Sequence, residues 1–302
     1  MHAWEAIQKT LEIIENRIDE DIPIEELADA AALSLFYYQR LFAKLVKKPV
    51  RGYIKLRRLA RACEALKNTN SRITDIALDY GFGSYEVFAR AFRDAYNITP
   101  TEYRESDVYL RNFDKPNLEL NYTMVEMGVP LISDGLVLEI NRRTLAEPIC
   151  FAGVQGFVPI DGHFPNGEVT GICGFGEVWR RFNDAAHKIP GKPNGRKTGV
   201  VYGGAPDGCF SYFVGIETEV PGADSGFKTW TMPAADYCVI GFEAESFEEL
   251  TSTALNKAVK YGHMWGDKNG IKPSGFGAEI YYNDTTTEPG VAYMEMWAPW
   301  LE

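Results

Sequence analysis

The chain has 302 residues, of which 45% are hydrophobic and 24% charged, as is typical of a globular protein with room for two domains. It has no run of 18 apolar residues, and its first residues form an amphipathic pattern, so we expect neither a membrane span nor a secretion signal. Five scattered cysteines without a CxxC pair indicate reduced thiols in a cytoplasmic protein and argue against a metal site.

The net charge of −11 hides one basic segment. Between Ser34 and Arg72 the sequence has eleven Lys or Arg residues and a single acid, which gives a local balance of +10. Since phosphate contacts require basic side chains, this segment keeps nucleic acid open as a partner of an otherwise acidic chain. Arg57, Arg58 and Arg61 fit either phosphate contacts or an ordinary solvated helix face.

Apolar residues at helical spacing predict four helices before residue 70. Ser34 can cap the third of these helices, and Pro49 opens the long fourth one. The residues expected to face a core are Ile7, Leu11, Ile14 and Ile18 in the first helix, and Tyr38, Leu41, Phe42 and Leu45 in the third.

The same order of elements then returns. A short helix ends at Gly81, which suits a left-handed stop, and a longer helix follows. Arg40 and Phe42 correspond to Arg90 and Phe92 at an offset of 50 residues. A repeat at nearly fixed offset indicates that one helix-turn-helix unit is used twice.

Both arginines lie away from the predicted core stripes when successive residues are placed about 100° apart on a helix. Arginine can bond guanine bidentately and glutamine can bond adenine, so such a helix can read a major groove. One such motif alone also fits a solvated surface, but two in register, joined by a basic helix, favour double-stranded DNA.

Residues 73–104 read IxDIAxxYGFxSxxxFxRAFRxxYxxTPxEYR, and over residues 1–104 the chain resembles the AraC/XylS-type DNA-binding domain. The resemblance implies seven helices, with two helix-turn-helix units bridged by the fourth helix and inserted into two adjacent major grooves. Two positions depart from the family pattern. Ala32 stands in a turn where glycine is common, and Glu86 places an acid toward DNA, where it would accept from cytosine or repel phosphate.

We call the two helices that carry Arg40 and Arg90 the reading helices. We expect the DNA-binding residues to lie on their outer faces and to include three lysines of the basic segment. They are Phe36, Gln39, Arg40, Lys44, Lys47, Lys48, Ser84, Tyr85, Glu86 and Arg90.

Helical periodicity stops after Arg104, and the pattern changes to strands near residue 135, interrupted by helical stretches at about 174–189 and 247–264. We therefore predict three parts, which are a DNA-binding domain (1–106), an ordered linker (107–133) and a second domain (134–302). The expected fold class is multidomain, an all-α double helix-turn-helix domain followed by an α+β domain of two related strand-strand-helix-strand-strand halves.

The second domain resembles the GyrI-like effector-binding domain of Rob-type regulators, on its strand order and on the ending YMEMWAPW. The resemblance implies a cleft with aromatic walls and a carboxylate that takes small, apolar or cationic molecules. Strand alternation places Glu295 with Trp297, and Glu279 with Tyr281, on shared faces. Core packing is the alternative for each aromatic residue. The predicted ligand-binding residues are Glu295, Trp297, Glu279, Tyr281, Trp265 and Trp179.

The sequence has no GxSxG, HExxH, Walker or dinucleotide-binding motif, so we predict no enzyme and no cofactor. We predict a DNA-binding transcriptional regulator that senses a small-molecule effector and has RNA polymerase as a partner. Two alternatives stay open: a second domain that acts on its ligand as a hydrolase, and a vestigial pocket in a ligand-independent regulator.

Overall fold

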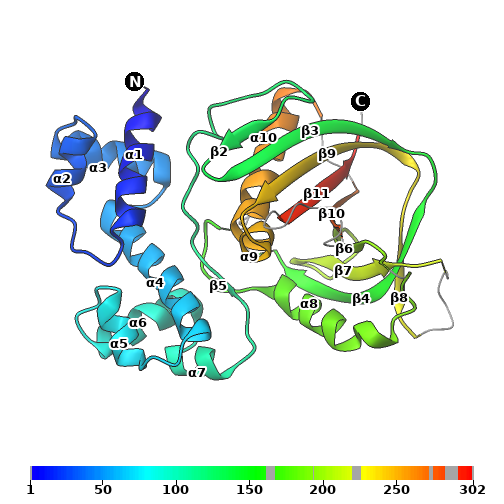
Figure 1. Ribbon diagram of the computed structural model, residues 1–302, viewed down its shortest axis with the longest axis horizontal. Helices are drawn as coiled ribbons and strands as arrows, with labels where there is room; N and C mark the ends of the chain where they lie inside the picture. The colour runs from blue at the N-terminus through cyan, green and yellow to red at the C-terminus, as the bar shows by residue number, and fades with distance from the viewer. Residues whose placement is uncertain are drawn as a thin grey trace. The chain divides into compact units, whose positions relative to one another are not determined.

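The computed structural model describes residues 2–160, 167–192, 194–219, 226–271, 275–282 and 292–300 (Figure 1). The chain divides into two compact units. Unit 1 comprises residues 1–122 and 166–173, and unit 2 comprises residues 123–165 and 174–302. Unit 1 is helical and unit 2 combines helices with a large sheet, which confirms the coarse fold class. The predicted limits at 106 and 133 stay a prediction.

The helices of unit 1 begin at residues that suit helix starts. Ser34 and Ser84 accept hydrogen bonds from the backbone at the third position of their helices, and Thr99 forms a capping box with Glu102. Pro23 and Pro49 precede two others. The helices are α1 (Ala3–Asn16), α2 (Ile24–Ala30), α3 (Leu35–Val46), α4 (Val50–Asn68), α5 (Ile73–Asp79), α6 (Tyr85–Tyr96) and α7 (Pro100–Glu105).

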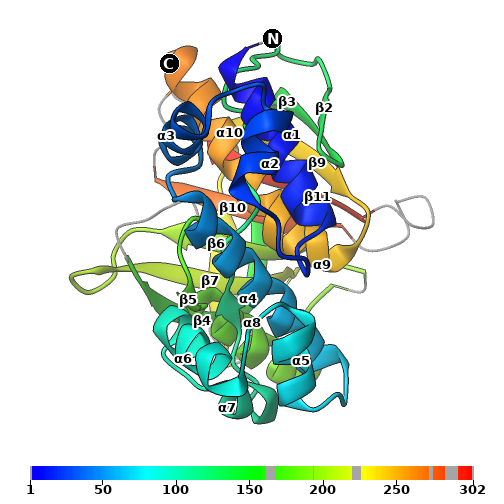
Figure 2. The ribbon, with the colours of Figure 1, turned by 90° about the vertical axis from the view of Figure 1, so that its left-hand side faces the viewer.

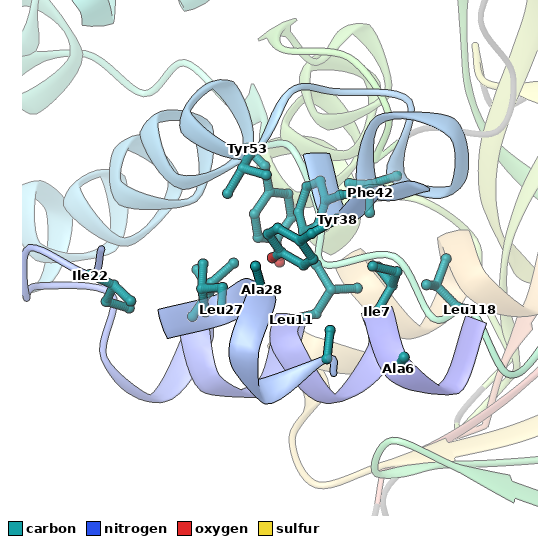
Figure 3. Close-up of a cluster of buried hydrophobic side chains, with 14 of the residues drawn as sticks. Ala6, Ile7, Leu11, Ile22, Leu27, Ala28, Tyr38, Phe42, Tyr53 and Leu118 are labelled. Atoms are coloured by element: carbon teal, nitrogen blue, oxygen red, sulfur yellow. The ribbon is translucent and has the colours of Figure 1, made fainter. Parts of the chain in front are cut away.

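Two hydrophobic cores hold unit 1 together, one for each helix-turn-helix. In the first, Tyr38 and Phe42 of α3 pack with Tyr53 of α4 against the apolar stripe of α1 (Figure 3). In the second, Phe88, Phe92 and Tyr96 of α6 pack against α4 and α5. Helix α4 runs from the one half to the other (Figure 2). The residues predicted to face a core are buried, including Ile18 just beyond the end of α1. Leu41 and Leu45 are the exceptions, since they are half-buried at the edge of the first core.

The first part of the predicted linker belongs to the helical unit. Residues 107–122 belong to unit 1, where β1 (Leu110–Arg111) pairs with β5 (Gly171–Ile172), a segment from far along the chain. The Asp114 amide donates to the Gly167 carbonyl (2.8 Å), and the Cys173 amide donates to the Tyr109 carbonyl (2.7 Å). The chain therefore leaves unit 2 after 165 and returns to it at 174.

Unit 2 is an antiparallel sheet with the strand order β2-β3-β9-β11-β10-β6-β7-β4-β8. The strands are β2 (Leu131–Ser133), β3 (Leu136–Leu145), β4 (Ile149–Pro159), β6 (Lys197–Tyr202), β7 (Cys209–Glu217), β8 (Lys228–Met232), β9 (Ala235–Ala244), β10 (Phe276–Tyr281) and β11 (Ala292–Pro299). Its helical segments are α8 (Gly174–Ala185), η1 (Ala186–Lys188), α9 (Phe247–Glu249), η2 (Leu250–Ala254) and α10 (Leu255–Lys268).

The sheet has to curl. Strands β3 and β4 stand six places apart in the order, which would be about 29 Å in a flat sheet. Only the residues between Leu145 and Ile149 join them, and these span at most about 14 Å. Strands β8 and β9 are also six places apart and are joined between Met232 and Ala235. Both connections close only if the sheet bends, as β3 and β9 do in Figure 1.

Each face of the curled sheet has its own packing. On one face, helix α8 packs against β4 and β7. Helix α10 packs against β9, and η2 packs against both β9 and β11. The other face carries a cluster of aromatic and aliphatic side chains that includes Phe151, Phe213, Tyr237 and Trp297. Because side chains alternate along a strand, neighbouring residues of β10 belong to different faces.

Candidate nucleic-acid interface and buried carboxylate cluster

The two reading helices of unit 1 start and stop alike. The Ser34 hydroxyl accepts from the Tyr37 amide (3.4 Å), and the Ser84 hydroxyl accepts from the Val87 amide (3.3 Å). Each helix ends at a residue in the left-handed region, Lys47 with φ 60° and Asn97 with φ 60°. The repeat seen in the sequence is therefore a repeat of backbone geometry.

The turns before these helices also correspond. The Ala32 amide donates to the Asp29 carbonyl (2.9 Å), and the Gly81 amide donates to the Leu78 carbonyl (2.9 Å). Ala32 has φ 54° and Gly81 has φ 70°, so both occupy the left-handed region. Alanine pays a steric cost there that glycine avoids, on the order of 1 kcal/mol. The departure noted at Ala32 is thus a strained turn with unchanged geometry.

The outer faces of α3 and α6 carry the predicted reading residues. The Phe36 side chain is 68% exposed, and Gln39, Arg40 and Arg90 are exposed as well. Among the described residues, no carboxylate lies within salt-bridge distance of either arginine. Both guanidinium groups therefore carry uncompensated charge on the surface.

The remaining predicted residues of unit 1 differ in exposure. Lys44 and Lys47 are exposed, whereas Lys48 is half-buried with its ammonium 5.6 Å from the centre of the Phe113 ring. Ser84 and Tyr85 are half-buried at the start of α6.

Glu86 is hydrogen-bonded within the protein at the start of α6. A hydrogen bond from the Ser84 side chain and one from its own backbone amide hold the pKa of this exposed carboxyl below its usual range. An ionised carboxylate in the first turn also suits the positive end of the helix dipole. Glu86 therefore stabilises the start of α6, whether or not it reads a base.

The basic residues in the middle of α4 are engaged inside the protein. Arg57 pairs with Glu15 through its Nε (2.7 Å) and Nη2 (2.9 Å) and donates to the Phe113 carbonyl (2.6 Å). Burial alone would raise the pKa of Glu15, but the hydrogen bonds and charge of Arg57 hold it below its usual range. Arg58 donates to three backbone carbonyls, and Arg61 lies 3.7 Å from Glu15. The guanidinium groups of Arg57 and Arg58 are thus bonded within the protein, which argues against both of the roles considered for them, a phosphate contact and a solvated helix face.

In unit 2 the predicted ligand residues form two separate clusters. In the sheet register Glu279 lies opposite Met296, and Ile280 lies opposite Glu295. Glu279 and Glu295 therefore belong to opposite faces. Trp265 joins neither cluster, because it is buried on α10 with its indole N–H bonded to the Val125 carbonyl (2.8 Å).

The carboxylate of the cluster around Glu295 is buried, and its charge is already paired. This carboxylate is 1% exposed and pairs with Arg143 (2.8 Å). It also accepts from the Tyr293 hydroxyl (2.6 Å), the Trp297 indole (2.8 Å) and the Tyr282 hydroxyl. With a cation and three donors, its oxygens have the partners that a buried charge requires.

The cluster around Glu279 has no such cation in the part of the chain that the structure describes. Its Oε2 accepts from the hydroxyls of Tyr281 (2.6 Å) and Tyr212 (3.0 Å), and Tyr212 in turn accepts from the Trp179 indole (2.9 Å). Among the described residues, no Lys, Arg or His lies within 4.0 Å of it. Burial raises the pKa of Glu279 to about 7, although the two tyrosine hydrogen bonds lower it. This carboxyl is therefore poised to change charge near neutral pH.

Aromatic rings surround Glu279. Trp179 and Tyr281 meet edge to face with their centroids 5.0 Å apart, and the 62% exposed Phe247 lies 6.2 Å from Tyr281. A Cβ on Gly199 would come within 2.2 Å of the Tyr212 hydroxyl and 2.6 Å of the Glu279 carboxylate, so this position requires glycine. Tyr212 was missed by sequence reasoning, because it reaches Glu279 from a strand two places away.

The described part of the chain contains neither a cluster of metal ligands nor a membrane-spanning helix. Over the described ranges, no three His, Cys, Asp or Glu side chains gather in a way that could hold a metal ion. The helices in those ranges are also too short or too polar to cross a bilayer.

Comparisons with known proteins single out unit 1. Residues 27–106 match a family described as a helix-turn-helix domain. The regulatory protein SoxS of Salmonella typhimurium is 36% identical over 104 residues, which cover 34% of this chain and 97% of SoxS. The uncharacterized HTH-type transcriptional regulator YbfP of Bacillus subtilis is 43% identical over 104 residues, 34% of this chain and 35% of YbfP. The transcriptional regulator Rob of Salmonella typhimurium is 31% identical over 130 residues, 43% of this chain and 45% of Rob.

The chain thus spans almost all of SoxS but less than half the length of YbfP and of Rob. The matched family residues contain the helices from α3 to α7, with both reading helices, their caps and their turns. The chain belongs to the AraC/XylS family of helix-turn-helix transcriptional regulators.

Proposed function

We propose that the protein binds double-stranded DNA through α3 and α6 in two adjacent major grooves and regulates transcription there. The observation that carries this proposal is the repeat of cap, turn, stop and exposed arginine in the two helices. Two helices held on one strut match two grooves about 34 Å apart along one face of the duplex. The site then has no need of palindromic symmetry.

The outer residues divide by their chemistry. Arg40 and Arg90 suit bidentate contacts to guanine, Gln39 suits adenine, and the exposed Phe36 ring suits a thymine methyl group. The exposed Lys44 and Lys47 suit phosphate contacts, which position the protein without reading sequence. RNA polymerase is the partner that this activity implies.

Selection from a random duplex library tests the proposal. The wild-type chain is used to select a binding duplex, and its Kd is then measured for Arg90→Ala, Arg40→Ala and the charge-matched control Arg72→Ala. Arg72 is 82% exposed, pairs with Asp75 and directly precedes α5, so it belongs to neither α3 nor α6. We expect the reading variants to bind about 10- to 100-fold more weakly, since a bidentate base contact is worth ~1–3 kcal/mol. Equal Kd values for Arg90→Ala and Arg72→Ala would refute the assignment.

For unit 2 we propose a GyrI-like effector domain made of two related halves. The first half would be β3, β4, α8, β6 and β7, and the second β8, β9, α10, β10 and β11. If each strand is exchanged for its counterpart in the other half, the strand order from β3 to β8 becomes its own reverse. The helices support the same relation, because α8 packs on β4 and α10 packs on β9, the counterpart of β4.

The proposed effector is a small aromatic or aliphatic cation that binds at Glu279. This carboxyl is 9% exposed, lies among Trp179, Tyr212 and Tyr281, and has no cationic partner in the described part of the chain. An organic cation would supply the missing charge, and each ring would add about 0.5–2 kcal/mol of cation–π attraction. Glu295 is the weaker candidate, since Arg143 already neutralises it.

A matched pair of probes tests the effector site. Benzyltrimethylammonium and its neutral isostere neopentylbenzene are titrated against the full chain while tryptophan fluorescence is followed. We expect only the cation to bind, more tightly as the pH rises through 7, and Glu279→Gln to remove this preference. Equal binding of the two probes would exclude an ionised Glu279 as the recognition group.

A catalytic second unit is the other candidate, because a carboxyl with a pKa of about 7 is suited to act as a general base. A change in the mass of a bound compound on incubation would separate turnover from sensing. No thermal shift with any cationic or apolar compound would instead favour a vestigial site.

A further inference from the structure

The two halves of the DNA-binding unit have separate cores. Among the described residues, none belongs to both hydrophobic clusters. Helix α4 contributes Tyr53 and Leu56 to the first cluster and Leu59 and Cys63 to the second. The change from one core to the other therefore falls at the middle of α4, between Leu56 and Leu59. Without further ties, the two reading helices would be related mainly by this single helix.

Arg57 and Arg58 occupy this point, and they bond differently. The described hydrogen bonds of Arg57 go to the first half, to Glu15 and to the Phe113 carbonyl. The Arg58 guanidinium reaches both halves. Its Nε donates to the Ile18 carbonyl (2.8 Å) and its Nη2 to the Glu20 carbonyl (2.7 Å), both just beyond α1. Its Nη1 donates to the Gly81 carbonyl (3.1 Å) in the turn that leads into α6.

The turn is shaped to receive this guanidinium. Gly81 has φ 70°, and a Cβ built on it would lie 2.7 Å from the Arg58 Nη1 and 2.8 Å from its Cζ. Glycine takes this backbone conformation without steric cost, and it leaves room for the close approach of Arg58, which would have to shift if a Cβ were present. Ala32, the corresponding residue of the first turn, needs no such space, because Arg58 lies against the second turn.

A second tie runs along the segment after α7. Leu110 packs against the second core, Phe113 belongs to the first, and the Tyr96 hydroxyl donates to Asn112 (2.7 Å). This segment therefore connects the two halves beside α4 and at the C-terminal end of α6. Arg58 acts at the opposite end, where the turn sets the entry angle of α6.

We propose that Arg58 is a positioning residue that fixes the phase of α6 relative to α3 and thereby selects DNA sites by the spacing of their two halves. This inference rests on the proposed DNA binding. One additional base pair between two half-sites shifts them by about 3.4 Å and rotates them by about 35°. A rigid pair of helices rejects such a site, whereas a loosely joined pair follows it at the cost of affinity for the correct one.

The experiment measures binding as a function of spacing. The probe is the duplex that the wild-type chain selects from a random library, together with derivatives that have one base pair inserted or deleted between the half-sites. Kd values are measured for the wild type, Arg58→Ala, Arg58→Lys and Lys55→Ala. Lys55, exposed on the same helix, controls for the loss of one positive charge.

We expect the wild type to prefer the selected spacing strongly, and this preference to fall about tenfold in Arg58→Ala, as for the loss of charge-assisted hydrogen bonds. Arg58→Lys should lie between the two, because lysine retains the charge but lacks the fork of donors. Lys55→Ala should weaken binding to all spacings by the same factor.

An unchanged spacing preference in Arg58→Ala would overturn the proposal, and so would a uniform loss at all spacings in a folded Arg58→Lys. If Arg58→Ala does not fold, as shown by circular dichroism, Arg58→Lys decides. A wild-type chain that selects no duplex would instead refute the proposed DNA binding, so the two failures are distinguishable.

Discussion

Replacement of Glu279 by Gln should change how the stability of unit 2 depends on pH. The pKa of this carboxyl is raised from 4.5 to about 7, so the native state keeps its proton over a range in which the unfolded chain has lost it. The free energy of unfolding therefore decreases as the pH rises from 4.5 to 7 and then levels off. From pH 5 to pH 8 the loss is roughly 2–3 kcal/mol, at about 1.4 kcal/mol per pH unit.

Glutamine retains the size of the side chain and cannot ionise. The difference in unfolding free energy between Glu279→Gln and the wild type should therefore grow by roughly 2–3 kcal/mol from pH 5 to pH 8. Urea unfolding followed by tryptophan fluorescence measures it, since five of the six tryptophans lie in unit 2. Taking the difference between variants cancels the contributions of all other titrating groups.

Glu177→Gln is the matched control. Glu177 is an exposed carboxyl of unit 2 whose pKa is lowered by the hydrogen bond from Arg180. Its contribution to the unfolding free energy therefore changes with pH in the opposite direction and only below pH 4.5. The difference in unfolding free energy between Glu177→Gln and the wild type should therefore not change between pH 5 and pH 8. A flat difference for Glu279→Gln as well would show that Glu279 is ionised and well solvated at neutral pH, and it would refute the reasoning behind the cation site.

Two further predictions concern unit 1. Arg57→Ala should lower its unfolding free energy by up to about 3–5 kcal/mol in urea followed by circular dichroism, because the buried Glu15 keeps only the more distant Arg61 (3.7 Å) as a cation. Adding Glu15→Gln should recover part of this loss, and a cost below about 1 kcal/mol would mean that the pair is solvated. Ala32→Gly should raise the thermal midpoint by relieving a left-handed alanine worth about 1 kcal/mol, whereas Gly81→Ala should lower it. The same direction of change in both variants would contradict the equivalence of the turns.

The helical unit could be predicted from local signals. Caps at Ser34 and Ser84, a glycine stop and buried residues at helical spacing all lie within a few positions of each other in the chain, and the repeat states them twice. The hydrogen bonds of Arg57 and Arg58 could not be predicted in this way. Their partners, Glu15 and the carbonyls of Ile18, Glu20 and Gly81, are more than 20 residues away in sequence.

The candidate ligand site shows where strand alternation stops being informative. Alternation correctly pairs Glu279 with Tyr281, since both contact each other on one face. Whether Glu295 joins them depends on the register between β10 and β11, in which it stands opposite Ile280. A slip of one residue would have placed both carboxylates on one face. Tyr212 could not be predicted for a similar reason. Its contact with Glu279 depends on the order of the strands, in which β7 and β10 are two places apart.

The path of the chain between the two units limits how they can be separated. A fragment that stops at residue 122 would lose residues 166–173, and with them the partner strand of Leu110–Arg111 and the carbonyl that holds Asp114. The complementary fragment would carry that segment without its own neighbours. Protease digestion or truncation at a single bond therefore yields two incomplete pieces. A clean dissection of this protein requires a fusion that supplies the β5 segment to the helical half.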